Sequence, residues 1–275
     1  MNFLPLVLYV AAGAAYAMHF ARRSAGVGRT ATTLLLFGVL VHTFVIGMET
    51  MEVWRVPFAN TSRAVSSFVW LLTLSYLYLE LTTEERGMGV FIVPFVALLQ
   101  LIPALNPGTE LRDPVLNSPW FWVHVSSLLF AYASFGLAGL LGLTYVLQFK
   151  EIKKKHLGYL YTRLPSLQML DVMNSRAVAI GWLFLTIGVV VGVIWTAQAR
   201  AISPLDNNLQ AMALDDPKIF FAALAWVVYS FAVVARRTMG LSGRRAAWVS
   251  AVGFAIVLLN FLPISYFVET SHSFY

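Results

Sequence analysis

The sequence contains no cysteine and few charged residues. None of its 275 residues is cysteine, and Asp, Glu, Lys and Arg together make up only 12% of the chain. The absence of cysteine excludes disulfides, thiolate metal ligands and thiol redox chemistry within the chain itself. A soluble domain carries about 25% charged residues, so the low charge argues against an ordinary soluble protein.

Several motifs of nucleotide and hydrolytic chemistry are also missing. The chain has no Gly-x-Gly-x-x-Gly segment, no Walker loop, no His-Glu-x-x-His and no Gly-x-Ser-x-Gly elbow. We therefore do not expect this chain alone to drive transport by hydrolysing a phosphate ester. A binding or accessory component is expected rather than a classical enzyme.

Long apolar runs fill most of the chain. Hydrophobic residues make up 59% of it, and its mean hydropathy is +0.74. A helix that crosses the bilayer needs about 20 predominantly apolar residues. The runs predict an all-α, polytopic membrane protein with one integral membrane domain, residues 1–275, and a lipid bilayer around it. The eight predicted spans are 3–20, 31–51, 65–81, 89–105, 120–149, 177–197, 219–234 and 246–268.

The basic residues predict how these spans are oriented. Fourteen of the 19 Lys and Arg residues follow the first, third, fifth and seventh runs, and five lie in the alternate segments. Cytoplasmic loops collect Lys and Arg, so we expect the first set inside and both termini outside. This asymmetry explains the net charge of +6 without a nucleic-acid partner. The first run starts at Phe3 with no basic residues before it, so we expect a retained span rather than a cleaved signal peptide.

Two histidines are predicted to lie at the outer face. His124 follows Pro119, Trp120 and Trp122 at the start of the fifth run, and His272 lies just past the eighth. Neutral imidazole is a common metal ligand, and haem iron takes one from each side. The pair could therefore ligate a porphyrin iron, although spacing alone also fits two unrelated interfacial histidines.

His42 differs because it falls near the middle of the second run. A polar residue in the middle of the membrane is unfavourable unless it has a partner. His42 is therefore either a ligand or relay for a cofactor within the bilayer, or a structural hydrogen-bonding residue. The partner in the second case would be a Ser, Thr or Tyr of a neighbouring helix.

Two further groups of residues have simpler interpretations. Several tryptophans map near the outer face, among them Trp54, Trp195 and Trp226, and tryptophan at this depth is typical of an aromatic belt. The segment from Lys150 to Arg176 is basic and is predicted to be cytoplasmic. It could run as a helix along the membrane surface, with its cations facing anionic headgroups.

Residues 122–133 resemble the histidine-bearing helix of the cytochrome c assembly family of integral membrane haem-handling proteins: Trp122-Val-His124-Val-Ser-Ser-Leu-Leu-Phe-Ala-Tyr-Ala. Four further segments agree in the same order, and the resemblance covers about residues 55 to 275. The four are Asn60-Thr-Ser-Arg-Ala-Val-Ser-Ser-Phe-Val-Trp70, Arg163-Leu-Pro-Ser-Leu-Gln-Met-Leu-Asp171, Gly181-Trp-Leu-Phe-Leu-Thr-Ile-Gly-Val-Val-Val-Gly-Val-Ile-Trp195 and Thr270-Ser-His272-Ser-Phe-Tyr275.

The resemblance implies a haem site at the outer face of a bacterial cytoplasmic membrane. His124 and His272 would be the axial pair for haem b, with His42 as a second haem position. The site would also include Trp122, Trp195 and Asp216. Apocytochrome c would be the partner that supplies the thiols, because this chain has no cysteine, and a second membrane subunit would complete the assembly.

One loop departs from the family pattern. Well-known members carry a Trp-rich loop between these histidines that ends in Trp-Asp-Pro-Lys. Here the loop from Gln198 to Lys218 keeps only Asp216-Pro-Lys, and Asp215 stands where the tryptophan would be. Two alternatives to haem delivery therefore stay open: a non-catalytic regulator or accessory subunit linked to haem synthesis, and a small-molecule permease.

Overall fold

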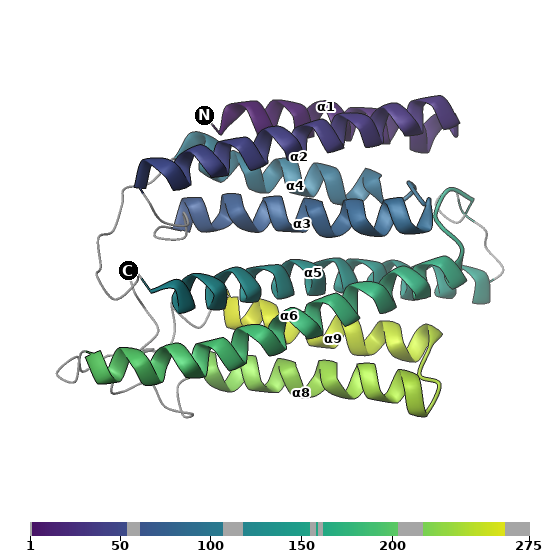
Figure 1. The fold of residues 1–275 in the computed structure, drawn as a ribbon. Helices are drawn as coiled ribbons and strands as arrows, with labels where there is room; N and C mark the ends of the chain where they lie inside the picture. The colour runs from purple at the N-terminus through teal and green to yellow at the C-terminus, as the bar shows by residue number, and fades with distance from the viewer. Residues whose placement is uncertain are drawn as a thin grey trace. The chain divides into compact units, whose positions relative to one another are not determined.

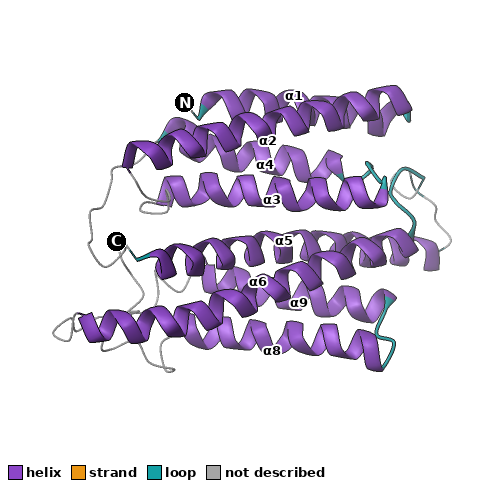
Figure 2. Ribbon diagram, viewed as in Figure 1, coloured by secondary structure: helices purple, strands orange, loops and turns teal. Residues whose placement is uncertain are grey.

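The computed structural model describes residues 2–53, 61–106, 118–154, 158, 162–202 and 217–261. Within these residues all regular structure is helical (Figures 1 and 2). The helices are α1 (Phe3–Arg22), α2 (Ala25–Val53), α3 (Thr61–Thr83), α4 (Gly89–Leu105), α5 (Pro119–Lys153), α6 (Leu167–Ile202), α8 (Pro217–Thr238) and α9 (Gly243–Phe261).

Each predicted span overlaps one of these helices, so the all-α polytopic membrane fold is confirmed. Among the described residues, six helices are long and apolar enough to cross a membrane: α1, α2, α3, α5, α6 and α8. Helix α4 is shorter, with 17 residues, and contains Pro94 and Pro103. Helix α9 is described as far as Phe261, whereas the predicted span continues to residue 268.

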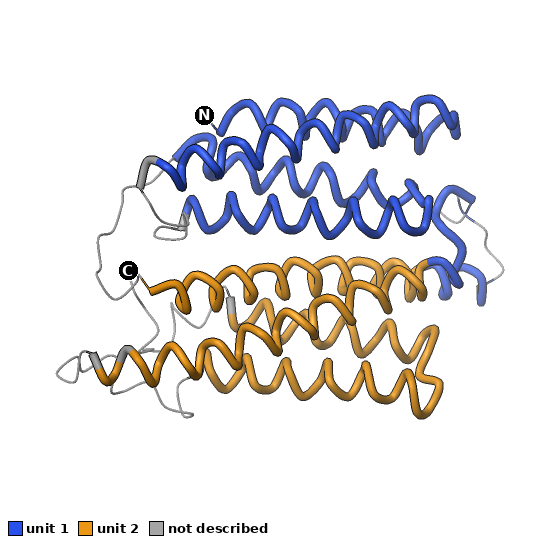
Figure 3. Tube along the Cα trace, viewed as in Figure 1, with its two compact units in different colours: residues 1–112, 148–169 blue, residues 113–147, 170–275 orange. Residues whose placement is uncertain are grey.

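The chain forms two compact units (Figure 3). Unit 1 comprises residues 1–112 and 148–169, which include α1 to α4. In this unit α1 packs against α2 and α4, and α3 packs against α2 and α4. The Cα of Gly89 lies so close to the Tyr16 ring that a Cβ there would be 2.2 Å from a ring carbon. Glycine at this position therefore lets α1 and α4 approach closely.

Unit 2 comprises residues 113–147 and 170–275, which include most of α5 and α6 together with α8 and α9. Buried polar groups join its helices. Asn174 of α6 donates to the carbonyl of Ala138 in α5 at 2.7 Å, and it accepts from the Ser250 hydroxyl of α9 at 2.9 Å. Each of these bonds is buried, so each satisfies groups that water cannot reach.

The segment before α6 differs from the prediction of a surface helix. Helix α6 already begins at Leu167, so residues 167–176 are its first turns. Ser166 caps this end, because its hydroxyl accepts from the backbone N–H of Met169 at 3.2 Å. Leu170 and Met173 are fully buried, which shows that the apolar face of α6 extends upstream of residue 177. Residues 167–176 therefore belong to the long helix α6 and not to a separate surface helix.

Candidate functional site

His124 lies in the second turn of α5 and is half-buried. Its Nδ1 is 2.7 Å from the carbonyl oxygen of Gly188 in α6. A carbonyl can only accept, so Nδ1 must carry the proton of this bond. In the neutral ring, Nε2 then holds the lone pair that a metal ion requires. Metal-ligating histidines are oriented in the same way, with the second ring nitrogen donating to a carbonyl or carboxylate.

Glycines of α6 make room for this imidazole. A Cβ at Gly192 would lie 2.5 Å from Nδ1 and 2.6 Å from Cε1 of His124. One turn earlier, a Cβ at Gly188 would lie 2.8 Å from Leu128 Cδ2. Only glycine lets the backbone approach side chains this closely. The Gly188-x-x-x-Gly192 spacing is the sequence signal for this contact, although the spacing alone does not show which side chain it accommodates.

Trp195 lies on the face of α6 that packs against His124. Its indole is 2% exposed and lies nearly parallel to the His124 ring, with centroids 6.3 Å apart and an interplanar angle of 16°. Phe121 lies 5.2 Å from Trp195 between ring centroids. The structure therefore brings two of the predicted site residues together. Trp122, a third, is half-buried two residues before His124.

The two other predicted residues of this site, His272 and Asp216, lie outside the described residues, so their role stays a prediction. Among the described residues, no group of three or more His, Cys, Asp or Glu side chains could hold a metal ion. A haem site needs no such group, because the porphyrin supplies four ligands and the protein only the axial ones. The chemistry of His124 therefore fits one axial position.

His42 is fully buried in unit 1 and forms two hydrogen bonds. Its Nδ1 lies 2.9 Å from the Tyr9 hydroxyl of α1, and its Nε2 lies 2.9 Å from the Ser66 hydroxyl of α3. In either neutral tautomer one nitrogen donates and the other accepts. A hydroxyl therefore donates to the unprotonated ring nitrogen. This arrangement corresponds to a structural hydrogen-bonding residue, one of the two interpretations of His42 that the sequence left open.

A buried carboxylate lies on the same helix as Ser66 and was not singled out in the sequence. Glu80 of α3 is 1% exposed and accepts from the Tyr16 hydroxyl at 2.6 Å and from the Thr32 hydroxyl at 2.5 Å. Arg86 approaches it to 3.8 Å and donates to Thr32 at 2.9 Å. The signal for this cluster was an acidic residue within an apolar run.

Comparisons with known proteins identify the family of this chain. A family model described as "Cytochrome C assembly protein" matches residues 5–272. Similar relatives include the "Cytochrome c biogenesis protein CcsA" of Guillardia theta, 25% identical over 259 residues, with 87% of this chain and 83% of the relative covered. The protein of that name from Chlamydomonas reinhardtii is 27% identical over 231 residues, with 79% of this chain and 60% of the relative covered.

The family match begins 50 residues before the start of the resemblance at about residue 55, so it includes α1 and α2 as well. It also spans every predicted site residue, from His42 to His272. The chain therefore belongs to the cytochrome c assembly protein family.

Proposed function

We propose that this protein binds haem b and takes part in cytochrome c assembly, and that His124 would hold the haem iron. The observation that carries the proposal is the hydrogen bond from His124 Nδ1 to the Gly188 carbonyl, which directs the lone pair to Nε2. Family membership supports the assembly role. We place the site at the outer face of the membrane, as the distribution of Lys and Arg predicts, and we propose a bacterial cytoplasmic membrane from the family resemblance.

The residues around His124 have separate parts in holding the ligand. The Gly188 carbonyl keeps the proton on Nδ1 and makes Nε2 a stronger base. Gly192 lets the ring lie against the α6 backbone, and the buried Trp195 indole lies parallel to the imidazole. His272 is the proposed second ligand. Haem, when bound, supplies the iron for these imidazoles and the vinyl groups that react with cysteine thiols.

The thiols must come from a partner, since the chain has no cysteine. We propose apocytochrome c for this role and a second membrane subunit that completes the assembly. The contribution of this chain would then be positioning, in which a bound group is held in a productive orientation. That mechanism matches the absence of hydrolytic and nucleotide motifs from the sequence.

Absorption spectra of the purified protein test the proposal. Wild type should show a Soret band and sharp α and β bands on reduction. His124→Ala should lose or shift these bands, whereas His19→Ala, which removes a histidine from unit 1, should retain them. Equal spectra for wild type and His124→Ala would exclude His124 as a ligand. If wild type binds no haem even after reconstitution, a regulator or accessory subunit becomes the better description.

A further inference from the structure

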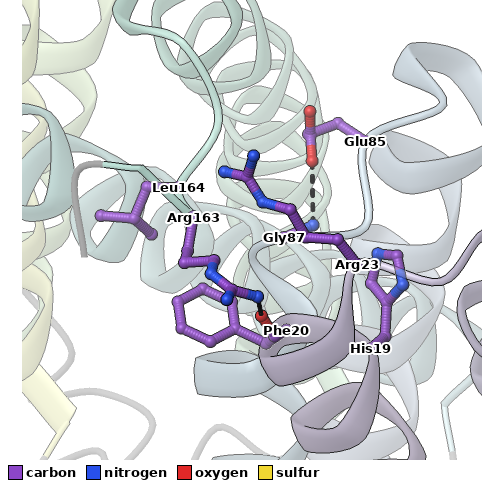
Figure 4. Close-up of a pocket in the computed structure, with 7 residues that line it drawn as sticks. All are labelled: His19, Phe20, Arg23, Glu85, Gly87, Arg163 and Leu164. Carbon is purple, nitrogen blue, oxygen red and sulfur yellow. Dashed lines mark hydrogen bonds between the residues drawn. The ribbon is translucent and has the colours of Figure 1, made fainter. Parts of the chain in front are cut away.

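A polar pocket of about 230 Å³ lies at one end of unit 1 (Figure 4). Three parts of the chain form it: the end of α1, the turn between α3 and α4, and the segment that precedes α6. The lining residues are His19, Phe20, Arg23, Glu85, Gly87, Arg163 and Leu164. Two of the lining side chains carry guanidinium groups: Arg23 at the end of α1 and Arg163 in the segment before α6.

The end of α1 positions both arginines, through the backbone of Arg23 and the side chain of Arg163. Arg23 is its C-cap and adopts the left-handed conformation, with φ of 52°, while its N–H donates to the His19 carbonyl at 2.8 Å. A residue other than glycine is uncommon there. Arg163 Nη1 donates to the carbonyls of Phe20, at 2.6 Å, and Ala21. Its charge is thereby fixed at the negative end of the α1 dipole.

Two other titratable groups line the pocket. The Glu85 carboxylate accepts from the backbone N–H of Gly87 at 2.9 Å. His19 Nδ1 lies 2.9 Å from the carbonyl of Ser24, so this nitrogen carries a proton. The described lining residues therefore include two permanently charged guanidinium groups and one carboxylate, so the side chains of the pocket carry a net positive charge.

The walls of the pocket pack against each other. A Cβ at Gly87 would lie 3.2 Å from Pro165 Cδ and 3.4 Å from the Arg163 carbonyl oxygen. The carbonyl of Pro165 in turn accepts from the buried Gln148 amide of α5 at 3.1 Å. The turn after α3 and the segment before α6 are thus fixed by tertiary contacts, so the Arg163 charge is positioned before any ligand arrives.

We propose that this pocket binds the phosphate group of an anionic phospholipid. Guanidinium groups recognise phosphate through a planar fork of N–H donors. Basic pockets between spanning helices on the cytoplasmic side take lipid headgroups, and the distribution of Lys and Arg predicts this end of unit 1 to be cytoplasmic. Phe20 and Leu164 provide apolar lining next to the charges. The volume is below the roughly 300–1,000 Å³ of sites for drug-sized ligands, which favours a small anionic group.

Native mass spectrometry of the full chain, purified and delipidated in detergent, tests this assignment. Dioctanoyl phosphatidylglycerol, dioctanoyl phosphatidylcholine and inorganic phosphate are titrated separately. Arg23→Gln removes a lining charge, and Arg22→Gln removes the exposed neighbouring charge that does not line the pocket. Loss of one charge-assisted contact predicts about tenfold weaker phosphatidylglycerol binding in Arg23→Gln. Arg22→Gln should stay within about twofold of wild type, because surface charges contribute little.

The two variants and the three ligands separate the outcomes. A preference for phosphatidylglycerol over phosphatidylcholine that depends on Arg23 and not on Arg22 supports the proposal. An equal loss in both variants would mean diffuse attraction to a basic surface and would overturn it. Inorganic phosphate binding that depends on Arg23, with no phosphatidylglycerol preference, would assign the pocket to a free anion and overturn the lipid assignment. Far-UV circular dichroism confirms that both variants are folded.

Discussion

Replacing Gly192 by alanine tests whether the α6 glycines position His124. The added Cβ would lie 2.5 Å from Nδ1 and 2.6 Å from Cε1 of the imidazole, about 1 Å closer than ordinary van der Waals contact. The ring must therefore move, and its 2.7 Å bond to the Gly188 carbonyl lengthens or breaks. Overpacking of this kind costs about 1–3 kcal/mol, and loss of a partner that orients a ligand weakens metal binding by about 10–100-fold.

The assay is a titration of the haem-free protein with haem, followed at the Soret band, alongside thermal unfolding. Gly136→Ala is the matched control, because it adds the same methyl group to a glycine of α5 in the same unit. Its Cβ would lie 3.5 Å from Phe254 Cε2, an ordinary contact, so haem affinity should stay near that of wild type. Gly192→Ala with undiminished haem affinity would refute the role given to the glycines.

A double substitution separates a local effect from general loss of stability. If Gly192→Ala destabilises the protein because its methyl group collides with the imidazole, it should lower the free energy of unfolding less in the His124→Ala background. Residues in contact show such coupling, typically of about 0.5–3 kcal/mol. Equal destabilisation by Gly192→Ala in the wild-type and His124→Ala backgrounds would show that the methyl group acts elsewhere.

Two further predictions concern the buried polar groups of unit 1. His42→Phe leaves the hydroxyls of Tyr9 and Ser66 without their partner, and each unsatisfied buried group costs about 1–3 kcal/mol. Thermal unfolding should shift accordingly, and a haem-spectral change without a stability change would instead support the ligand role. Glu80→Gln keeps the size of the side chain but removes the charge opposite Arg86, so we expect lower stability in unfolding experiments. An unchanged or raised melting temperature would show that the buried charge does not stabilise the folded protein.

The spans could be predicted because the requirement for about 20 apolar residues is local in sequence. The start of α6 could not. The sequence predicts that the basic segment up to Arg176 lies outside the span, yet Asp171 and Asn174 belong to α6. In the structure, Asp171 pairs with Arg236 at 2.7 Å and Asn174 bonds to Ser250 at 2.9 Å. These partners lie 65 and 76 residues away, so the compensation is invisible in any local window.

Part of the candidate site could likewise be predicted from the sequence, and part could not. Placement of His124 at the start of a spanning helix followed from the sequence, because an ionisable residue there stands out against its apolar surroundings. Its supporting glycines did not follow, since their role depends on the register between α5 and α6. Gly188 lies 64 residues from His124, and many spanning helices contain glycine pairs with no ligand nearby.

The hydrogen-bond partners of His124 and His42 differ in what they determine about each imidazole ring. A backbone carbonyl can only accept, so Gly188 determines which nitrogen of His124 is protonated and leaves a lone pair on the other. Tyr9 and Ser66 present hydroxyls, which donate or accept, so His42 satisfies both nitrogens in either tautomer. A metal ion would have to displace one of these bonds within the membrane, where the displaced hydroxyl has no water to turn to. His42 therefore serves to hold α1, α2 and α3 together.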